Sequence, residues 1–204
     1  MKQILMTIAA AFVVTAMSAQ VYVGGTLGFQ NNKSNTSTTE NTVTGFGINP
    51  EIGMSLDDKL GVGIQLGFNS NKNKTEYVGT AAGTPSVETT ITTFELKPYL
   101  RYQLFQVSKF NVFVDGGVDF AIESQKDMKS GLDLGLFVTP GIAYNVTDNW
   151  SIVAKLNDMF NFGYSKSPVP DVAGAPDAPT SLNAGLSTGG FTLGALTFGV
   201  YYNF

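Results

Sequence analysis

Apolar side chains recur at every second position along most of this 204-residue chain, in segments that polar stretches separate. A period of two places alternate side chains on opposite faces of a β-strand, and no segment after residue 20 keeps a helical period. The pattern predicts an all-β fold of eight strands, at residues 21–29, 45–54, 60–68, 92–104, 110–122, 132–144, 150–160 and 191–204.

The connections between these segments are alternately long and short. Short ones follow the even-numbered segments, at 55–59, 105–109 and 145–149, while long polar or Pro/Ala-rich ones follow the odd-numbered segments, at 30–44, 69–91, 123–131 and 161–190. In an up-and-down barrel through a membrane, long loops gather on the extracellular side and short turns on the periplasmic side. A β-sandwich gives no reason for this sorting. The lengths therefore predict an eight-stranded antiparallel up-and-down transmembrane β-barrel.

The two faces of the strands differ in chemistry. From residue 45 onward the large apolar side chains are mainly even-numbered, whereas the glycines and nearly all strand charges are odd-numbered. The interior of an eight-stranded barrel is just wide enough for ordinary side chains, so the apolar face would overfill it. We therefore predict that the apolar face points outward to lipid. The alternative is a secreted ligand-binding barrel with the apolar face inside, whose exterior would be poorly soluble.

Three prolines lie inside predicted strands, at Pro50, Pro98 and Pro140. Proline cannot donate to a ladder and is normally found at a sheet edge or a bulge. A closed barrel has no edge, so local bulges near the periplasmic rim are expected.

The start of the chain has the pattern of a cleaved secretory signal. Lys2 precedes a short apolar run at 4–14, and small residues follow it. The run is too short to span a membrane, so we expect cleavage after Ala19 or after Ser18, with a buried N-terminal helix as the alternative. The expected organisation is a signal peptide at 1–19 and an outer-membrane β-barrel domain at 20–204.

Composition excludes several classes of function. The chain has no cysteine and no histidine, which removes disulfides, thiolate nucleophiles, histidine-based triads and histidine metal sites. The net charge is −4 without a basic patch, so nucleic acid is not an expected partner. The glycine-rich stretches open no helix, and the acidic clusters lack the spacing of a calcium loop. We therefore predict no enzyme activity, no cofactor and no metal site.

On the inward face, a single register of one strand pair sets opposite charges across from each other. A turn centred near Ser108 pairs residues whose numbers sum to 216, which sets Lys97 opposite Asp119 and Arg101 opposite Asp115. One interpretation is a salt-bridge network that fills the lumen and fixes the register; the other is a gated polar conduit or proton path, for which eight strands leave little room. The predicted network comprises Glu51, Glu95, Lys97, Arg101, Asp115, Asp119 and Lys155.

The chain ends on the alternating segment LTFGVYYNF, whose last residue is a bare aromatic. Its apolar row, Phe198, Val200, Tyr202 and Phe204, is expected to face lipid on a strand that closes the barrel against the first. With the signal peptide, this row resembles the C-terminal signal that outer-membrane barrels present to the β-barrel assembly machinery. Residues 20–204 as a whole resemble the small OmpA/OmpX-type eight-stranded barrels of the "porin family". The resemblance implies a Gram-negative outer membrane, contact with its lipid and lipopolysaccharide, and assembly by that machinery.

Three functions are compatible with these features. The first is a non-enzymatic integral outer-membrane protein with an envelope-structural role or a surface-contact role, through an extracellular partner of the long loops. The second is a narrow porin, or a channel for small apolar solutes that opens laterally to lipid, which the many inward glycines motivate. The third is the secreted ligand-binding barrel, which the volume argument disfavours.

The loop lengths predict which connections reach the cell surface. An epitope tag near Gly83, in the long 69–91 connection, should be detected on intact cells, and the 161–190 connection should be exposed in the same way. A tag at Asp58, in the short 55–59 turn, should be detected only after the outer membrane is permeabilised. Labelling of the Asp58 tag on intact cells would contradict this orientation.

Overall fold

The computed structural model describes residues 20–36, 39–77, 86–156, 159–172, 177–186 and 196–204. Its strands are β1 (Val21–Asn35), β2 (Thr39–Ser55), β3 (Leu60–Tyr77), β4 (Val87–Val107), β5 (Phe110–Gln125), β6 (Met128–Lys129), β7 (Gly131–Asn145), β8 (Trp150–Leu156), β9 (Phe160–Lys166), β10 (Val169–Pro170), β11 (Thr180–Leu186) and β12 (Leu196–Asn203). The predicted signal peptide at 1–19 lies outside the described residues. Within them, no helix is long and apolar enough to cross a membrane.

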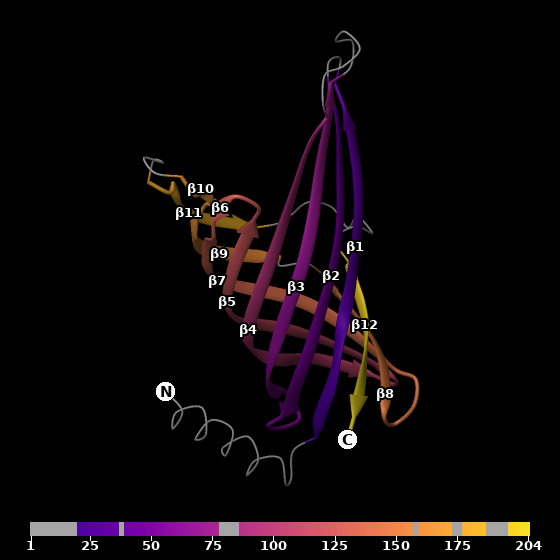
Figure 1. The fold of residues 1–204 in the computed structure, drawn as a ribbon. Coiled ribbons are helices and arrows are strands. Elements are labelled where there is room, and N and C mark those ends of the chain that lie inside the picture. Colours follow the sequence, from indigo (N-terminus) through magenta and orange to yellow (C-terminus); the bar gives the residue numbers. More distant parts are fainter. Residues whose placement is uncertain (1–19, 37–38, 78–85, 157–158, 173–176, 187–195) are drawn as a thin grey trace.

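Antiparallel pairing closes eight of these strands into a ring. Neighbours pair in the order β1, β2, β3, β4, β5, β7 and β8, and β12 joins β8 back to β1. The closing ladder runs from Tyr22 opposite Asn203 to Leu27 opposite Phe198, and Figure 1 shows β12 beside β1. The predicted eight-stranded antiparallel barrel is therefore confirmed.

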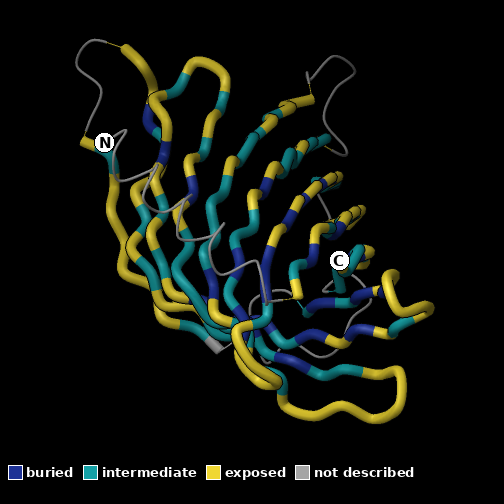
Figure 2. Tube along the Cα trace, turned by 90° about the horizontal axis from the view of Figure 1, so that it is seen from below, coloured by how far each residue is buried: buried dark blue, intermediate teal, exposed yellow. Residues whose placement is uncertain are grey.

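The outward face of the barrel is apolar. Exposed and less exposed residues alternate along the strands, as Figure 2 shows. On β2, for example, Phe46 and Ile48 are exposed, whereas Asn49 and Glu51 are buried. The prediction that the apolar face points outward is confirmed, because side chains that could form an ordinary core line the outside of the wall instead.

The first four strands are longer than the sequence predicts. The β1–β2 ladder continues to Asn35 opposite Glu40, and the β3–β4 ladder continues to Thr75 opposite Val87. Asn, Ser and Thr favour turns, so the sequence predicts loops at 30–44 and 69–91, but these stretches are mostly strand. In Figure 1 the four strands rise above the rest of the molecule. Their outer part, residues 28–35, 39–47, 69–77 and 87–93, is referred to below as the projecting sheet.

The predicted strand at 150–160 is two strands. β8 pairs with one half of β7, from Asn145 to Gly141, and β9 pairs with the other half, from Val138 to Leu132. The change of partner falls at Pro140, whose nitrogen cannot donate to a ladder. β9 and β11 also pair with each other, so the predicted long connection at 161–190 is partly strand. Of the predicted last strand, residues 191–195 lie outside the described part.

The bulges agree with the prediction only in part, because one lies near the short 108–109 turn and a register shift lies at Pro140, but Pro50 and Pro98 have none. The β4–β5 register shifts between Gln103 and Phe105, which makes Leu104 the extra residue of a bulge. The register is the same on both sides of Pro50 and of Pro98, so the predicted bulges at these two prolines are wrong. Pro140 does coincide with a shift, because the numbers of paired residues sum to 296 on one side of it and 298 on the other.

Short turns at 56–59, 108–109 and 146–149 join the strands at one end of the barrel. Both ends of the described chain lie there, since Ser55 donates to the carbonyl of Gln20 and Phe204 donates to that of Val21. This end is referred to as the short-turn end and the opposite one as the long-hairpin end. In the first turn, the Asp57 carboxylate accepts the backbone N–H of Lys59 and of Leu60, each at 2.7 Å, and these bonds lower the pKa of the Asp57 carboxyl.

Candidate functional site in the barrel lumen

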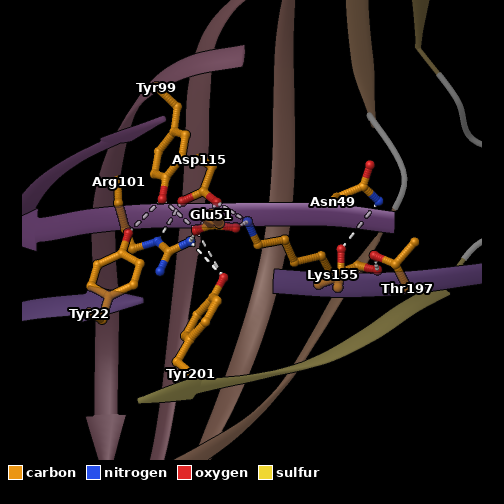
Figure 3. A network of polar contacts seen from close by, with 10 residues as sticks. Tyr22, Asn49, Glu51, Tyr99, Arg101, Asp115, Lys155, Thr197 and Tyr201 are labelled. Atoms are coloured by element: carbon orange, nitrogen blue, oxygen red, sulfur yellow. Dashed lines mark hydrogen bonds and ion pairs between the residues drawn. The ribbon is translucent and has the colours of Figure 1, made fainter. Parts of the chain in front are cut away.

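Two acidic and two basic side chains meet inside the barrel, one each from β2, β4, β5 and β8. The guanidinium of Arg101 donates to both carboxylate oxygens of Asp115, from Nε at 2.6 Å and from Nη2 at 2.8 Å, and Nη2 also donates to Glu51 Oε1 at 2.9 Å. Lys155 Nζ lies 2.6 Å from Glu51 Oε2 and 3.0 Å from Asp115 Oδ2. Each charge thus contacts both charges of the opposite sign, in a closed cycle (Figure 3).

Aromatic side chains surround this cycle. The hydroxyls of Tyr99 and Tyr201 both donate to Glu51 Oε1, the second at 3.0 Å, and the Tyr22 hydroxyl lies 2.6 Å from that of Tyr99. Figure 3 shows these tyrosines pointing at the cycle from different strands. The ring of Phe113 stacks on Arg101, whose Cζ is 3.9 Å from the ring centroid, a favourable cation–π geometry. The central plug is the set Glu51, Arg101, Asp115 and Lys155 with Tyr22, Tyr99, Phe113 and Tyr201.

A glycine on the neighbouring strand makes room for each ring of the central plug. The cross-strand pairs are Tyr22 with Gly53, Tyr99 with Gly63, Phe113 with Gly141 and Tyr201 with Gly24. A Cβ atom added at any of these glycines would overlap the paired aromatic side chain. The glycines therefore let the rings lie across the barrel wall and fill the lumen, as aromatic residues do beside glycine in other sheets.

The charges of the central plug balance, and all but Arg101, whose side chain is 13% exposed, are almost completely buried. Asp115 is 1% exposed, and Glu51 and Lys155 are each 4% exposed. Removing an ion from water costs several kcal/mol, which close partners of opposite sign offset only when every ion has them. Two acids and two bases meet this condition here, so a change of one member leaves an uncompensated charge.

The central plug separates two cavities. A cavity of about 540 Å³ lies toward the long-hairpin end, and Tyr99, Asp115 and Lys155 belong to its lining. A cavity of about 660 Å³ lies toward the short-turn end, where Tyr22 and Arg101 belong to the lining. They are referred to as the long-hairpin cavity and the short-turn cavity. Because the plug residues line both, a solute could pass from one to the other only by separating them.

A second group of charges lies in the long-hairpin cavity. Lys97 Nζ is 3.4 Å from Asp119 Oδ2 and 3.7 Å from Glu95 Oε2, and it lies 5.1 Å from the centroid of the Phe137 ring. The structure therefore divides the predicted luminal network into two parts. Glu51, Arg101, Asp115 and Lys155 belong to the central plug, while Glu95, Lys97 and Asp119 form this cavity group.

Sequence reasoning missed the aromatic half of the central plug. Tyr99, Phe113 and Tyr201 are odd-numbered, and Tyr22 is even-numbered within the first strand, so the parity of the alternation assigns all four to the inward face. The volume argument fills the lumen with glycine and charge alone. The volume argument overlooks that each inward glycine leaves room for a ring on the next strand. Inward aromatic residues on strands next to inward glycines are the sequence signal that could have predicted the aromatic half of the plug.

The arrangement offers little chemistry to a substrate. The plug carboxylates are engaged by Arg101, Lys155 and tyrosine hydroxyls at hydrogen-bond distance. In the part of the chain that the structure describes, no three metal-ligating side chains gather. The geometry instead suits a barrier across the lumen.

A closed ring of eight strands with an apolar exterior and a polar lumen defines the chain as a transmembrane β-barrel of the outer-membrane type. A family model described as "Outer membrane protein beta-barrel domain" matches residues 4–204. The chain therefore belongs to this family, and its location is the outer membrane of a Gram-negative bacterium.

Solved structures of small outer-membrane barrels are similar to this chain. The outer membrane protein OprG from Pseudomonas aeruginosa matches with a TM-score of 0.53 and 13% identity, over 91% of this chain and 95% of that one. Neisserial surface protein A matches with a TM-score of 0.44 and 12% identity, over 91% and 97%. Outer membrane protein W from E. coli matches with a TM-score of 0.40 and 16% identity, also over 91% and 97%. The likeness to OprG shows the fold alone. No curated protein sequence matches this chain significantly.

The predicted C-terminal row lies on the outside of β12. Phe198, Val200 and Phe204 are 52%, 50% and 73% exposed. The ring centroid of Tyr202 is 4.9 Å from that of Phe204 and 5.1 Å from that of Trp150, both at steep angles. This aromatic group at the short-turn end suits a membrane interface. The role of the row as an assembly signal stays a prediction.

We expect Arg101→Met to destabilise the barrel more than Arg101→Met combined with Asp115→Leu. The single change leaves two buried carboxylates facing Lys155 alone, at a cost of about 3–5 kcal/mol, whereas the double change leaves the neutral Glu51–Lys155 pair. Urea unfolding from lipid vesicles measures both free energies.

The half-exposed surface ion pair of Lys33 with Glu40 provides a matched control for this comparison. Lys33→Met should change the free energy of unfolding by less than about 1 kcal/mol, because exposed pairs contribute little. If the losses from Arg101→Met and Asp115→Leu simply add in the double variant, Arg101 and Asp115 do not act as a pair.

Deletion of Phe204 should lower the amount of assembled barrel far more than the stability of the protein that does assemble. One interfacial aromatic contributes only about 1.5–3 kcal/mol through burial, and many other rows hold the barrel in lipid. Assembly machinery, in contrast, would read the terminal row before the barrel closes. The folded, heat-modifiable band in outer-membrane fractions is compared with refolding of the same variant in detergent. Normal assembly in cells beside poor refolding in detergent would make Phe204 a packing residue only.

Proposed function

We propose that this chain is a non-enzymatic outer-membrane protein with a structural and surface-contact role in the cell envelope, and that its long-hairpin end faces the outside of the cell. The observation that carries the proposal is the central plug. A conducting barrel needs a continuous polar path, and here eight side chains from opposite walls meet in the lumen. Transport would require the Arg101–Asp115 and Arg101–Glu51 contacts to separate.

The chemistry of the projecting sheet supports the proposed orientation. Its outward face carries the ion pairs of Lys33 with Glu40, Lys72 with Glu88 and Lys74 with Glu76, which replace the apolar rows found on the same strands lower in the wall. Half-exposed ion pairs suit water rather than hydrocarbon. Long polar hairpins on the extracellular side and short turns on the periplasmic side are the usual arrangement in outer-membrane barrels.

The partners in this proposal follow from the surfaces of the barrel. The apolar outward face would contact the lipid and lipopolysaccharide of the outer membrane. The terminal row Phe198–Phe204 would contact the β-barrel assembly machinery during biogenesis. The projecting sheet would be the part available to an extracellular partner.

A channel for small solutes is the second candidate function. Two observations favour it: large cavities approach the central plug from both ends, and the described β1–β12 pairing stops at Leu27. Phe29, Leu156 and Leu196 contribute to the lining of the long-hairpin cavity near that point, and this apolar lining is where the proposed lateral route for an apolar solute would begin.

Single-channel recording in planar bilayers distinguishes the two functions. The wild-type barrel should show no stable openings. The double variant Glu51→Ala/Arg101→Ala should show them, because it shortens two plug residues while Asp115 and Lys155 remain paired. Lys97→Ala, which leaves the central plug intact, should stay closed. Stable openings of the wild-type barrel that vanish when Arg101 is changed would contradict the closed barrel and favour the channel.

A further inference from the structure

Amide and hydroxyl side chains line the inward face of the projecting sheet and continue into the long-hairpin cavity. Gln30 on β1 and Asn71 on β3 both pair with Gly45 on β2, and one row lower Asn69 pairs with Gly47 and Thr93. The cavity lining extends this series to Asn49 and Gln65. The amide track is the set Gln30, Asn49, Gln65, Asn69, Asn71 and Thr93.

The glycines of β2 let these amides lie across the sheet. An added Cβ at Gly45 would overlap the Asn71 amide oxygen, and one at Gly47 would overlap that of Asn69. Gln30 Nε2 donates to Asn71 Oδ1 at 2.9 Å, which holds two of the amides in place. A primary amide has two N–H donors and an oxygen with two lone pairs, and this bond uses one donor of Gln30 and one lone pair of Asn71. Gln30, Asn69 and Asn71 are each only half-buried, so further donors and acceptors remain within reach of a ligand.

We propose that the amide track binds a neutral polyhydroxylated chain, that is, a glycan segment at the cell surface. This inference rests on the proposed surface-contact role and names the class of partner. Sugar hydroxyls both donate and accept hydrogen bonds, and a row of primary amides offers both functions along its length. All six residues of the track line the long-hairpin cavity, whose volume of about 540 Å³ is in the size range of small-ligand sites.

The charges beside the track disfavour acidic glycans, since Glu123 lies opposite Thr93 on the neighbouring strand. The cavity lining contains the carboxylates of Glu95, Asp115, Asp119, Glu123 and Asp133 but the amines of only Lys97 and Lys155, so its formal charge is 2 − 5 = −3. This field repels sulfate and carboxylate groups on a ligand. Carboxylates accept hydrogen bonds from neutral hydroxyls, so the same residues suit an uncharged sugar. The amide side chains of the track are uncharged, so a glycan chain that lies along them needs no charge to bind.

Binding is tested on the full barrel, refolded in a detergent without a sugar headgroup. The probes are maltohexaose, cellohexaose and chitohexaose as neutral chains, dextran sulfate as an anionic chain and spermidine as a cation. At least one neutral hexasaccharide should bind by calorimetry and should shift the side-chain amide NMR signals of Asn69 and Asn71. Dextran sulfate should not bind.

Asn69→Ala/Asn71→Ala should weaken the binding of that hexasaccharide by about tenfold or more, as expected for the loss of a few neutral hydrogen bonds. Asn31→Ala is the matched control, because Asn31 is an exposed amide next to Gln30 on the opposite face of β1, and it should change affinity by less than about twofold. The heat-modifiable band confirms that both variants are folded.

Three results would overturn the inference. The first is that none of the neutral chains binds, and the second is that dextran sulfate or spermidine binds more strongly than they do. The third is that wild type and Asn69→Ala/Asn71→Ala bind equally well. Failure of the inference is distinguishable from failure of the proposed function. A barrel that conducts ions but binds a neutral chain contradicts only the closed lumen. A barrel that stays closed but binds none contradicts only the amide track.

Discussion

The ion-pair cycle of Glu51, Arg101, Asp115 and Lys155 is the interaction on which this barrel depends. Most large apolar side chains point outward to lipid, so only a small buried cluster around Phe113 and Val153 packs inside the barrel. The cycle fixes the strands relative to one another, because it joins β2, β4, β5 and β8 across the lumen. A slip of one residue in any of these strands would turn its charge to the lipid face, which is costly in a membrane. The cycle therefore couples strand register to closure of the lumen.

The inward glycines and the aromatic rings of the central plug depend on each other, because each ring occupies the space beside a glycine. Eight strands enclose too little space for charges, rings and ordinary side chains at the same level, and the cross-strand pairing of Tyr22 with Gly53 and of Phe113 with Gly141 resolves this. The hydroxyls of Tyr99 and Tyr201 in turn donate to Glu51, and the ring of Phe113 stacks on Arg101, which stabilises the buried ions. Higher in the same strands, Gly45 and Gly47 accommodate amides rather than rings. The same spacing thus gives a barrier at the middle of the barrel and a polar surface toward its long-hairpin end.

The strand count, the outward apolar face and the β4–β5 charge pairs could be predicted, because they depend on local alternation and on one tight hairpin near Ser108. Arg101 lies opposite Asp115 in the structure, as the sum of 216 requires. The contact of Glu51 with Lys155 could not be derived, since these residues are 104 positions apart and meet only through the tilt and stagger of the closed ring. The length of the projecting sheet was also beyond prediction, because backbone ladders continue through Asn- and Thr-rich sequence whose side chains favour turns. The change of partner at Pro140 depends on how β8 and β9 share β7, which no single strand reveals.

Hydrogen exchange at Arg101 tests the closed, ion-paired lumen most directly. Arg101 is the only arginine in the chain, so arginine-selective ¹⁵N labelling yields a single Nε–H resonance. In the cycle this N–H donates to Asp115 Oδ1 at 2.6 Å, and the Arg101 side chain is 13% exposed. Its exchange with solvent should be slower than that of free arginine by roughly a hundredfold or more, because the bond to Asp115 must break before the proton can exchange. Asp115→Leu should restore fast exchange. A resonance that exchanges in the wild-type barrel as fast as in free arginine would contradict the closed lumen.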